Sequence, residues 1–72
     1  MPLAQIKVIE GVFSSDEKRQ IVEKVTEVLV SVEGEKLREK TVVIVEEVKS
    51  GDWGFGGQVL TTEDVKTLRS DQ

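Results

Sequence analysis

The stretch that most constrains this chain is residues 42–45, Val-Val-Ile-Val, where four β-branched apolar residues follow one another without a polar residue between them. A strand with one solvated face alternates apolar and polar side chains, whereas a strand covered on both faces does not. Strands covered on both faces belong mostly to parallel sheets. We therefore predict a strand over residues 41–46 that is buried on both faces and pairs in parallel with another strand.

A strand and a helix are predicted before this run. Residues 3–10 mix β-branched and polar residues in partial alternation, which favours a strand that Gly11 ends. Ser14 followed three residues later by Glu17 matches the capping box, so we expect a helix that begins near Ser15 and ends at Gly34. The apolar positions of this helix form one stripe of a 3.6-residue repeat: Ile21, Val22, Val25, Val28, Leu29 and Val32.

The rest of the chain consists of shorter elements. Residues 35–40 are a charged connector that can hold one helical turn, and residues 51–57 contain four glycines and two aromatics, which indicates a loop or hairpin. Residues 61–64 resemble the cap of a short C-terminal helix with a frayed end. We predict a single domain over residues 1–72 with a C-terminal tail from about residue 61.

The small size of the chain predicts oligomerisation. Seventy-two residues support only a marginal hydrophobic core, and the chain has neither cysteine nor histidine for a disulfide or a structural zinc site. Two parallel strands under one helix also leave one sheet face and two edges uncovered. We therefore expect a substantial interface with other subunits, and no metal or cofactor.

Charge and hydropathy exclude two classes of partner. The chain carries ten basic and fourteen acidic residues, a net charge of −4, with no long basic cluster, which argues against nucleic acid. Its apolar runs are about four residues long, far below the roughly 20 that a membrane-spanning helix needs. The first residues lack the layout of a signal peptide, so we expect a cytoplasmic location.

Three motifs together point to a family. They are Met1-Pro2 at the start, Ile9-Glu10-Gly11 at the end of the first predicted strand, and Glu46-Glu47 followed by Asp-Trp-Gly-Phe-Gly-Gly at residues 52–57. In this arrangement, residues 2–60 resemble the 4-oxalocrotonate tautomerase family. The aromatic-Gly-x-Gly-Gly segment behind a strand-helix-strand unit that begins at Pro2 is the most specific part of the match.

The resemblance implies an α+β fold: a β-α-β subunit with two parallel strands, one main helix and a C-terminal hairpin or short helix. Such subunits form a dimer with a four-stranded sheet, and three dimers form a hexamer. The resemblance also implies an enzyme that moves a proton in an enol of a 2-oxo acid such as 2-hydroxymuconate, with Pro2 as the general base once Met1 is removed. A terminal secondary amine suits this role, because burial in an apolar pocket lowers the pKa of an amine.

Two aromatic residues are the further site candidates. By the resemblance, Trp53 lies where the family has an aromatic lining the pocket, and Phe55 lies near an apolar wall position. Either side chain would exclude water from the proline and pack against a planar conjugated substrate. The alternative interpretation is that both are core residues of a subunit interface, where aromatics are common.

The chain departs from the family pattern at two positions. The family's two arginines, which bind the substrate carboxylate and polarise its 2-oxo group, correspond to Val12 and Val42. Valine supplies neither charge nor a hydrogen-bond donor. Three accounts stay open: a second, arginine-bearing chain completes a hetero-oligomer; Arg38, Lys40 or Lys7 replaces the arginines in an enzyme for a monocarboxylate; or the chain is a non-catalytic structural subunit.

Overall fold

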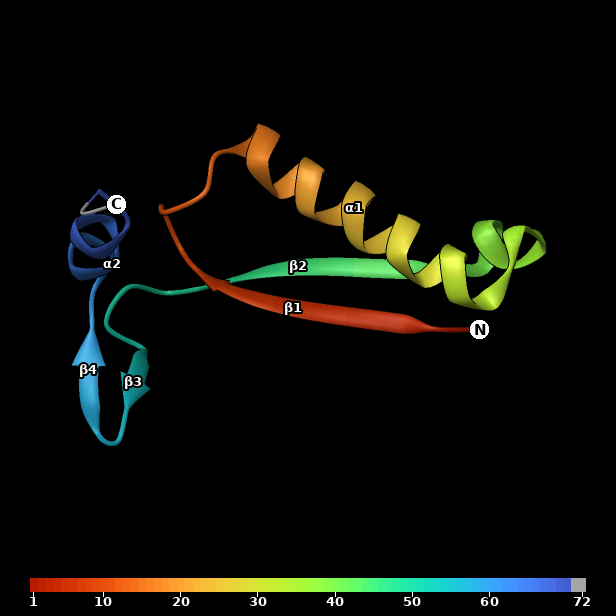
Figure 1. Cartoon of the computed structure of the whole chain (residues 1–72). Helices are drawn as coiled ribbons and strands as arrows, with labels where there is room; N and C mark the ends of the chain where they lie inside the picture. The colour runs from red at the N-terminus through yellow and green to blue at the C-terminus, as the bar shows by residue number, and fades with distance from the viewer. Residues whose placement is uncertain (71–72) are drawn as a thin grey trace.

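The computed structural model describes residues 1–70 (Figure 1). The elements follow in the order β1 (Leu3–Ile9), α1 (Ser15–Glu33), the 3₁₀ helix η1 (Glu35–Lys40), β2 (Val42–Val48), β3 (Trp53–Phe55), β4 (Gln58–Leu60) and α2 (Thr62–Ser70). Figure 1 shows α1 along one face of the β1–β2 pair, with the hairpin and α2 at the end of the sheet opposite the N-terminus. The predicted β-α-β subunit with a C-terminal hairpin or short helix is confirmed, and the structure has both C-terminal elements.

Strands β1 and β2 form a parallel ladder that runs from Leu3 opposite Val42 to Ile9 opposite Val48. Further backbone bonds lengthen it at both ends, since the Val42 N–H donates to the Pro2 carbonyl at 3.1 Å and the Glu10 N–H donates to the Val48 carbonyl at 2.8 Å. The parallel pairing predicted from the β-branched run is therefore correct.

The start and the end of helix α1 agree with the sequence. The Glu17 N–H donates to the Ser14 hydroxyl at 3.1 Å, and the Ser14 N–H donates to the Glu17 carboxylate at 3.0 Å, which completes the capping box. At the other end Gly34 has a φ of 103°, a conformation that favours glycine, and its N–H donates to the Val30 carbonyl at 2.9 Å.

The buried side of α1 is narrower than the predicted apolar stripe. Val30 is the buried residue of the helix, while Val28 and Val32, which the stripe included, are 64% and 86% exposed. Two strands about 5 Å apart form a ribbon about as wide as one helix, so they cover only a strip of its surface. Within one chain, Val28 and Val32 belong to the apolar stripe but are not buried, because the sheet is too narrow to reach them.

The face of the sheet turned away from α1 is open over most of its length. Leu3, Val42 and Ile44 on this face are 62%, 43% and 38% exposed. The prediction that residues 41–46 are buried on both faces is therefore wrong for the single chain, because one helix covers one face only. Coverage of the second face by other copies stays a prediction.

The hairpin and α2 lie at the far end of the sheet, where polar contacts fix them to the residues that follow β1 and β2 (Figure 1). The Thr62 hydroxyl donates to the Glu10 carbonyl at 2.6 Å, the Thr62 N–H donates to the Ser50 hydroxyl at 2.9 Å, and the Ser50 N–H donates to the Glu10 carboxylate at 3.0 Å. Thr61 and Asp64 cap the helix reciprocally. The predicted C-terminal helix is confirmed, and the fraying expected at its end falls on residues 71–72, outside the described residues.

The capping box gives a stability prediction. Replacing Ser14 with Ala removes the acceptor for the Glu17 N–H, so we expect the free energy of unfolding to fall by about 1 kcal/mol. The measurement is urea denaturation at one fixed protomer concentration, because assembly contributes to apparent stability. Ser15→Ala is the matched control at the next position, and an equal loss in both variants would contradict the role of the cap.

Candidate active site

An apolar pocket of about 290 Å³ lies where the carboxyl end of β1 meets the hairpin and α2. Its lining residues come from five parts of the chain: Lys7, Val8, Ile9, Phe13, Trp53, Phe55, Leu60, Val65 and Leu68. Trp53 and Phe55, predicted from the sequence as substrate-contacting residues, both belong to this lining, and so does Phe13 from the loop after β1.

The β3–β4 hairpin positions the two aromatics. Trp53 pairs with Leu60 and Phe55 with Gln58, and the turn between them is formed by Gly56 and Gly57 with φ of 55° and 88°. Two successive residues with positive φ make the tight hairpin turn that glycine favours. Since residues two apart in a strand lie on the same face, Trp53 and Phe55 both face the pocket. Trp53 is half-buried, whereas Phe55 is 65% exposed.

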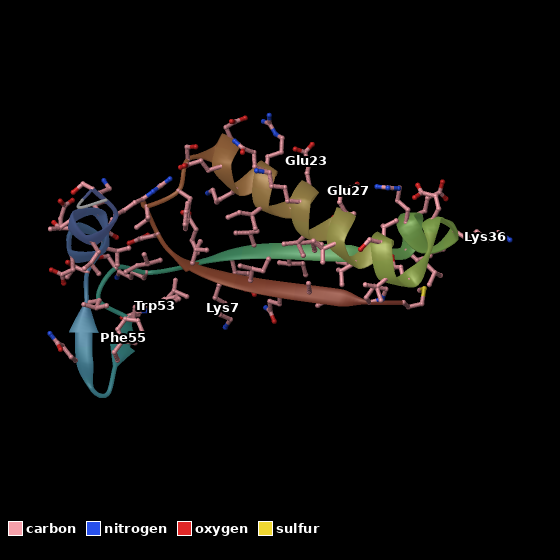
Figure 2. The ribbon with its side chains drawn as sticks, in the orientation of Figure 1. Lys7, Glu23, Glu27, Lys36, Trp53 and Phe55 are labelled. Carbon is pink, nitrogen blue, oxygen red and sulfur yellow. The ribbon has the colours of Figure 1, made fainter. Side chains whose placement is uncertain are left out.

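Pro2, the predicted base, lies at the opposite end of the same strand. It precedes β1, and its carbonyl accepts the hydrogen bond from the Val42 N–H. A strand advances about 3.3 Å per residue, so Pro2 lies roughly 20 Å from Ile9 at the pocket. Figures 1 and 2 agree, because the N-terminus and the labelled Trp53 and Phe55 occupy opposite ends of the sheet. One chain alone does not bring the predicted site residues together.

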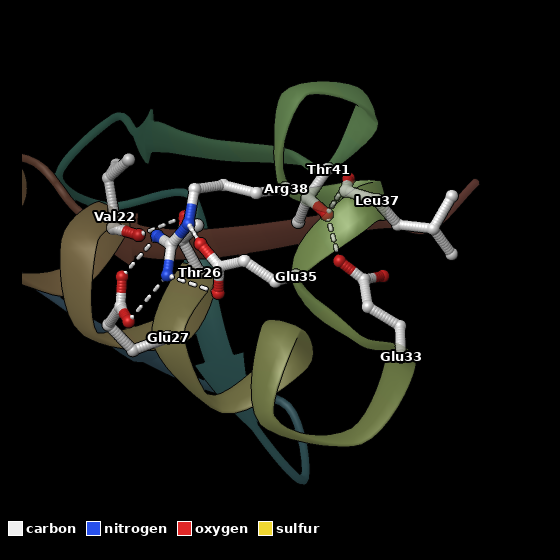
Figure 3. Close-up of polar contacts among 8 residues, drawn as sticks. All are labelled: Val22, Thr26, Glu27, Glu33, Glu35, Leu37, Arg38 and Thr41. Atoms are coloured by element: carbon white, nitrogen blue, oxygen red, sulfur yellow. Dashed lines mark hydrogen bonds and ion pairs between the residues drawn. The ribbon is translucent and has the colours of Figure 1, made fainter.

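Arg38, one of the proposed replacements for the family arginines, is engaged in ion pairs. Its guanidinium donates to the Glu27 carboxylate at 2.5 and 3.0 Å and to the Glu35 carboxylate at 2.6 and 3.2 Å (Figure 3). The hydrogen bonds from Arg38 lower the pKa of both carboxyl groups. Two carboxylates therefore neutralise this arginine, and its role is to join η1 to α1.

Arg69, which sequence reasoning did not single out, lies beside the first missing arginine position. Its guanidinium donates to the Val12 carbonyl at 3.0 Å, forms an ion pair with the Glu17 carboxylate and lies 5.0 Å from the centre of the Phe13 ring. These contacts fasten α2 to the loop after β1. The sequence carried one signal for Arg69, a basic residue in the last turn of the predicted C-terminal helix.

Among residues 1–70, Lys7 is the one ionisable residue that lines the pocket, and Lys40 is exposed at the end of η1. Residues 1–70 hold no cluster of three or more side chains suited to a metal ion. None of the helices in the described part of the chain is long and apolar enough to cross a membrane.

Comparison with known proteins decides the family. The family model described as "Tautomerase enzyme" matches residues 2–63. The chain belongs to the tautomerase family. It is 38% identical over 70 residues to the probable tautomerase Cj0270 of Campylobacter jejuni, covering 97% of this chain and 98% of the relative. It is also 36% identical over 61 residues to the 2-hydroxymuconate tautomerase of Bacillus subtilis, covering 85% and 95%.

Solved structures agree with this assignment to the tautomerase family. A structure of the 4-oxalocrotonate tautomerase isozymes from Methylibium petroleiphilum superposes with a TM-score of 0.72 at 33% identity, covering 89% of this chain and 97% of that one. The predicted membership of the 4-oxalocrotonate tautomerase family is thereby confirmed. The prediction that the chain belongs to a family of isomerases is confirmed as well.

The contact between Arg69 and Glu17 gives a pH prediction. The hydrogen bond from Arg69, together with that from the Ser14 backbone, lowers the pKa of Glu17 from 4.5 to about 2. The ionised carboxylate therefore stabilises the folded chain above pH 4.5, and this contribution is lost as the pH falls through about 2. We expect Arg69→Gln to lose less stability than the wild type between pH 4.5 and 2 in urea denaturation.

Arg19→Gln is the control for the change in net charge, since Arg19 makes an exposed ion pair with Asp16 on the surface of the same helix. Its pH profile should follow that of the wild type apart from a uniform offset. Parallel profiles for Arg69→Gln and the wild type would contradict the assignment of the Glu17 pKa to Arg69.

Proposed function

We propose that the chain is a subunit of an enol–keto tautomerase whose sites are shared between two copies. Pro2 of one copy, freed by removal of Met1, is the general base, and Trp53 and Phe55 of the other copy form the pocket wall. The observation that carries the proposal is the placement of Pro2 and the apolar pocket at opposite ends of one strand, β1, whose outer edge has no partner strand within residues 1–70.

Strand pairing between copies brings the two ends together. If two copies pair along their free β1 edges, a two-fold axis makes the two strands antiparallel. Residue 2 of each copy then lies beside the carboxyl end of β1 in the other copy, where the pocket is. The pairing produces the four-stranded sheet expected from the resemblance and removes one exposed edge from each chain. Assembly of such dimers into hexamers is part of the same proposal.

The chemistry is one proton transfer within the substrate. The neutral nitrogen of Pro2 accepts the proton of the enol hydroxyl, the 2-oxo group forms as the electrons shift along the conjugated chain, and the proline ammonium returns a proton to carbon. The O–H bond that breaks is replaced by a C–H bond, and neither redox chemistry nor a cofactor is needed. The apolar wall supports the reaction, because it favours the neutral form of the amine.

An alternative version of the proposal includes a partner chain that supplies positive charge to the site. Arg38 and Arg69 are both held in ion pairs, which favours an arginine-bearing partner chain that completes a hetero-oligomer. The partner stabilises the developing enolate in this version. Activity of the chain purified alone would remove the need for such a partner.

Mixing two inactive variants tests the shared site. We expect Pro2→Ala and Trp53→Ala each to lose most isomerase activity toward 2-hydroxymuconate or another 2-oxo acid enol. The two variants are mixed in equal amounts, unfolded and refolded together. About a quarter of the sites then combine an intact Pro2 with an intact Trp53 from different chains, so the mixture should regain about a quarter of the wild-type activity. The measurement is the steady-state rate of the mixture against each variant alone.

The control is a mixture of Pro2→Ala with the Pro2→Ala, Trp53→Ala double variant, in which every site lacks its base. A mixture of the two single variants no more active than this control would overturn the shared site. Mass spectrometry of the native protein is the second check, because a retained Met1 leaves Pro2 as an amide and favours a non-catalytic subunit.

A further inference from the structure

Lys7 lies where it can provide the charge that orients a ligand in the pocket. It is on the face of β1 turned away from α1, and Figure 2 shows its side chain on the side of the sheet where the hairpin with Trp53 and Phe55 lies. Lys7 belongs to the pocket lining, and it makes no ion pair with any other residue of the described range 1–70. Glu46 lies opposite Lys7 in the β1–β2 ladder, and its carboxylate accepts a hydrogen bond from the Gln5 amide.

The remainder of the lining sets how much charge a ligand can carry. Apart from Lys7 the pocket is walled by aliphatic and aromatic side chains. Arg69 lies close to the pocket through its contact with Phe13, and its guanidinium is paired with the Glu17 carboxylate. One carboxylate of a ligand therefore finds a partner, whereas a second one would lie unpaired against apolar walls at a considerable cost in desolvation.

The size and shape of the pocket select the body of the ligand. A volume of about 290 Å³ is at the small end for small-molecule sites. Trp53, Phe55 and Phe13 present aromatic rings from the hairpin and from the loop after β1, and rings of this kind pack well against a flat conjugated group. A phenyl-sized group joined to one carboxylate meets these requirements.

We infer that Lys7 is the carboxylate anchor of this pocket and that the site takes planar, apolar monocarboxylates, such as the enol of an aryl-substituted 2-oxo acid, in preference to dicarboxylates. The part of this inference that concerns the reaction of an enol rests on the proposed function. The part that concerns ligand binding does not depend on it. The ammonium of Lys7 pairs with the carboxylate, and the aryl group lies along Trp53 and Phe55.

Fluorescence of Trp53, the single tryptophan of the chain, reports binding directly. The purified assembly is titrated with trans-cinnamate, with the neutral cinnamamide and with the dianion trans,trans-muconate. We expect cinnamate to quench the fluorescence at the lowest concentration. Lys7→Met should weaken cinnamate binding about ten- to a hundredfold, the usual effect of losing a charged hydrogen bond, and leave cinnamamide binding unchanged.

Two matched variants complete the test. Lys7→Arg restores the charge and should recover most of the affinity, and Lys36→Met removes a lysine from the other end of the molecule (Figure 2) and should change nothing. Circular dichroism and the size of the assembly establish that each variant folds. Equal affinity for cinnamate and cinnamamide, tighter binding of muconate, or an unaltered cinnamate affinity in Lys7→Met would each overturn the inference.

Kinetics separate this inference from the proposed function. The probe is ketonisation of the enol of phenylpyruvate by the wild type, Lys7→Met and Pro2→Ala. Turnover that requires Pro2 and is insensitive to Lys7 would overturn the anchor and leave the proposed function standing. Lys7-dependent binding of cinnamate without any Pro2-dependent turnover would overturn the proposed function and leave the ligand class standing.

Discussion

The packing of one helix against two strands is the constraint on which the rest of this structure depends. Helix α1 covers one face of the β1–β2 ribbon, and Val8 and Val30 are buried between them. The hairpin and α2 lie at the end of the sheet opposite the N-terminus. The elements of residues 1–70 leave Leu3, Val42 and Ile44 exposed, so apolar surface of the sheet is open to other copies in the single chain.

The same constraint separates the parts of the site. The pocket forms where the C-terminal elements meet the end of β1, and Pro2 lies at the other end of that strand. In the proposed assembly, pairing along the free edge of β1 joins the base to the pocket and covers the strand edge. The stability and the activity of the subunit would then both depend on the pairing of two copies.

The contacts of α2 show how the pocket is kept in shape. Thr62 is tied to Glu10 and Ser50 at the start of the helix, and Arg69 is tied to the loop after β1 near its end. Gly11 has a φ of 78°, and a Cβ at this position would lie 3.1 Å from the Thr62 side chain, so a side chain is disfavoured there for two reasons. The loop that carries Phe13 is therefore held from both sides.

Much of the fold could be predicted from local signals, since the capping box at Ser14 and Glu17, the glycines of the hairpin and the β-branched run each act within a few residues. The prediction failed where the outcome depends on what covers a surface. Val28 and Val32 continue the helical stripe but find no sheet beneath them, and Val42 and Ile44 face away from α1. The role of Arg69 depends on contacts with residues more than fifty positions away in the sequence, which no local pattern encodes.

The central claim is that Pro2 of one copy reaches the Trp53 pocket of another. The most direct measurement is an isotope-filtered nuclear Overhauser experiment on an assembly mixed from ¹³C-labelled and unlabelled chains. The account predicts intermolecular contacts between the Pro2 ring protons and the Trp53 indole protons. Contacts of Pro2 restricted to its own chain, or a Pro2 ring with no neighbour in the assembly, would contradict it.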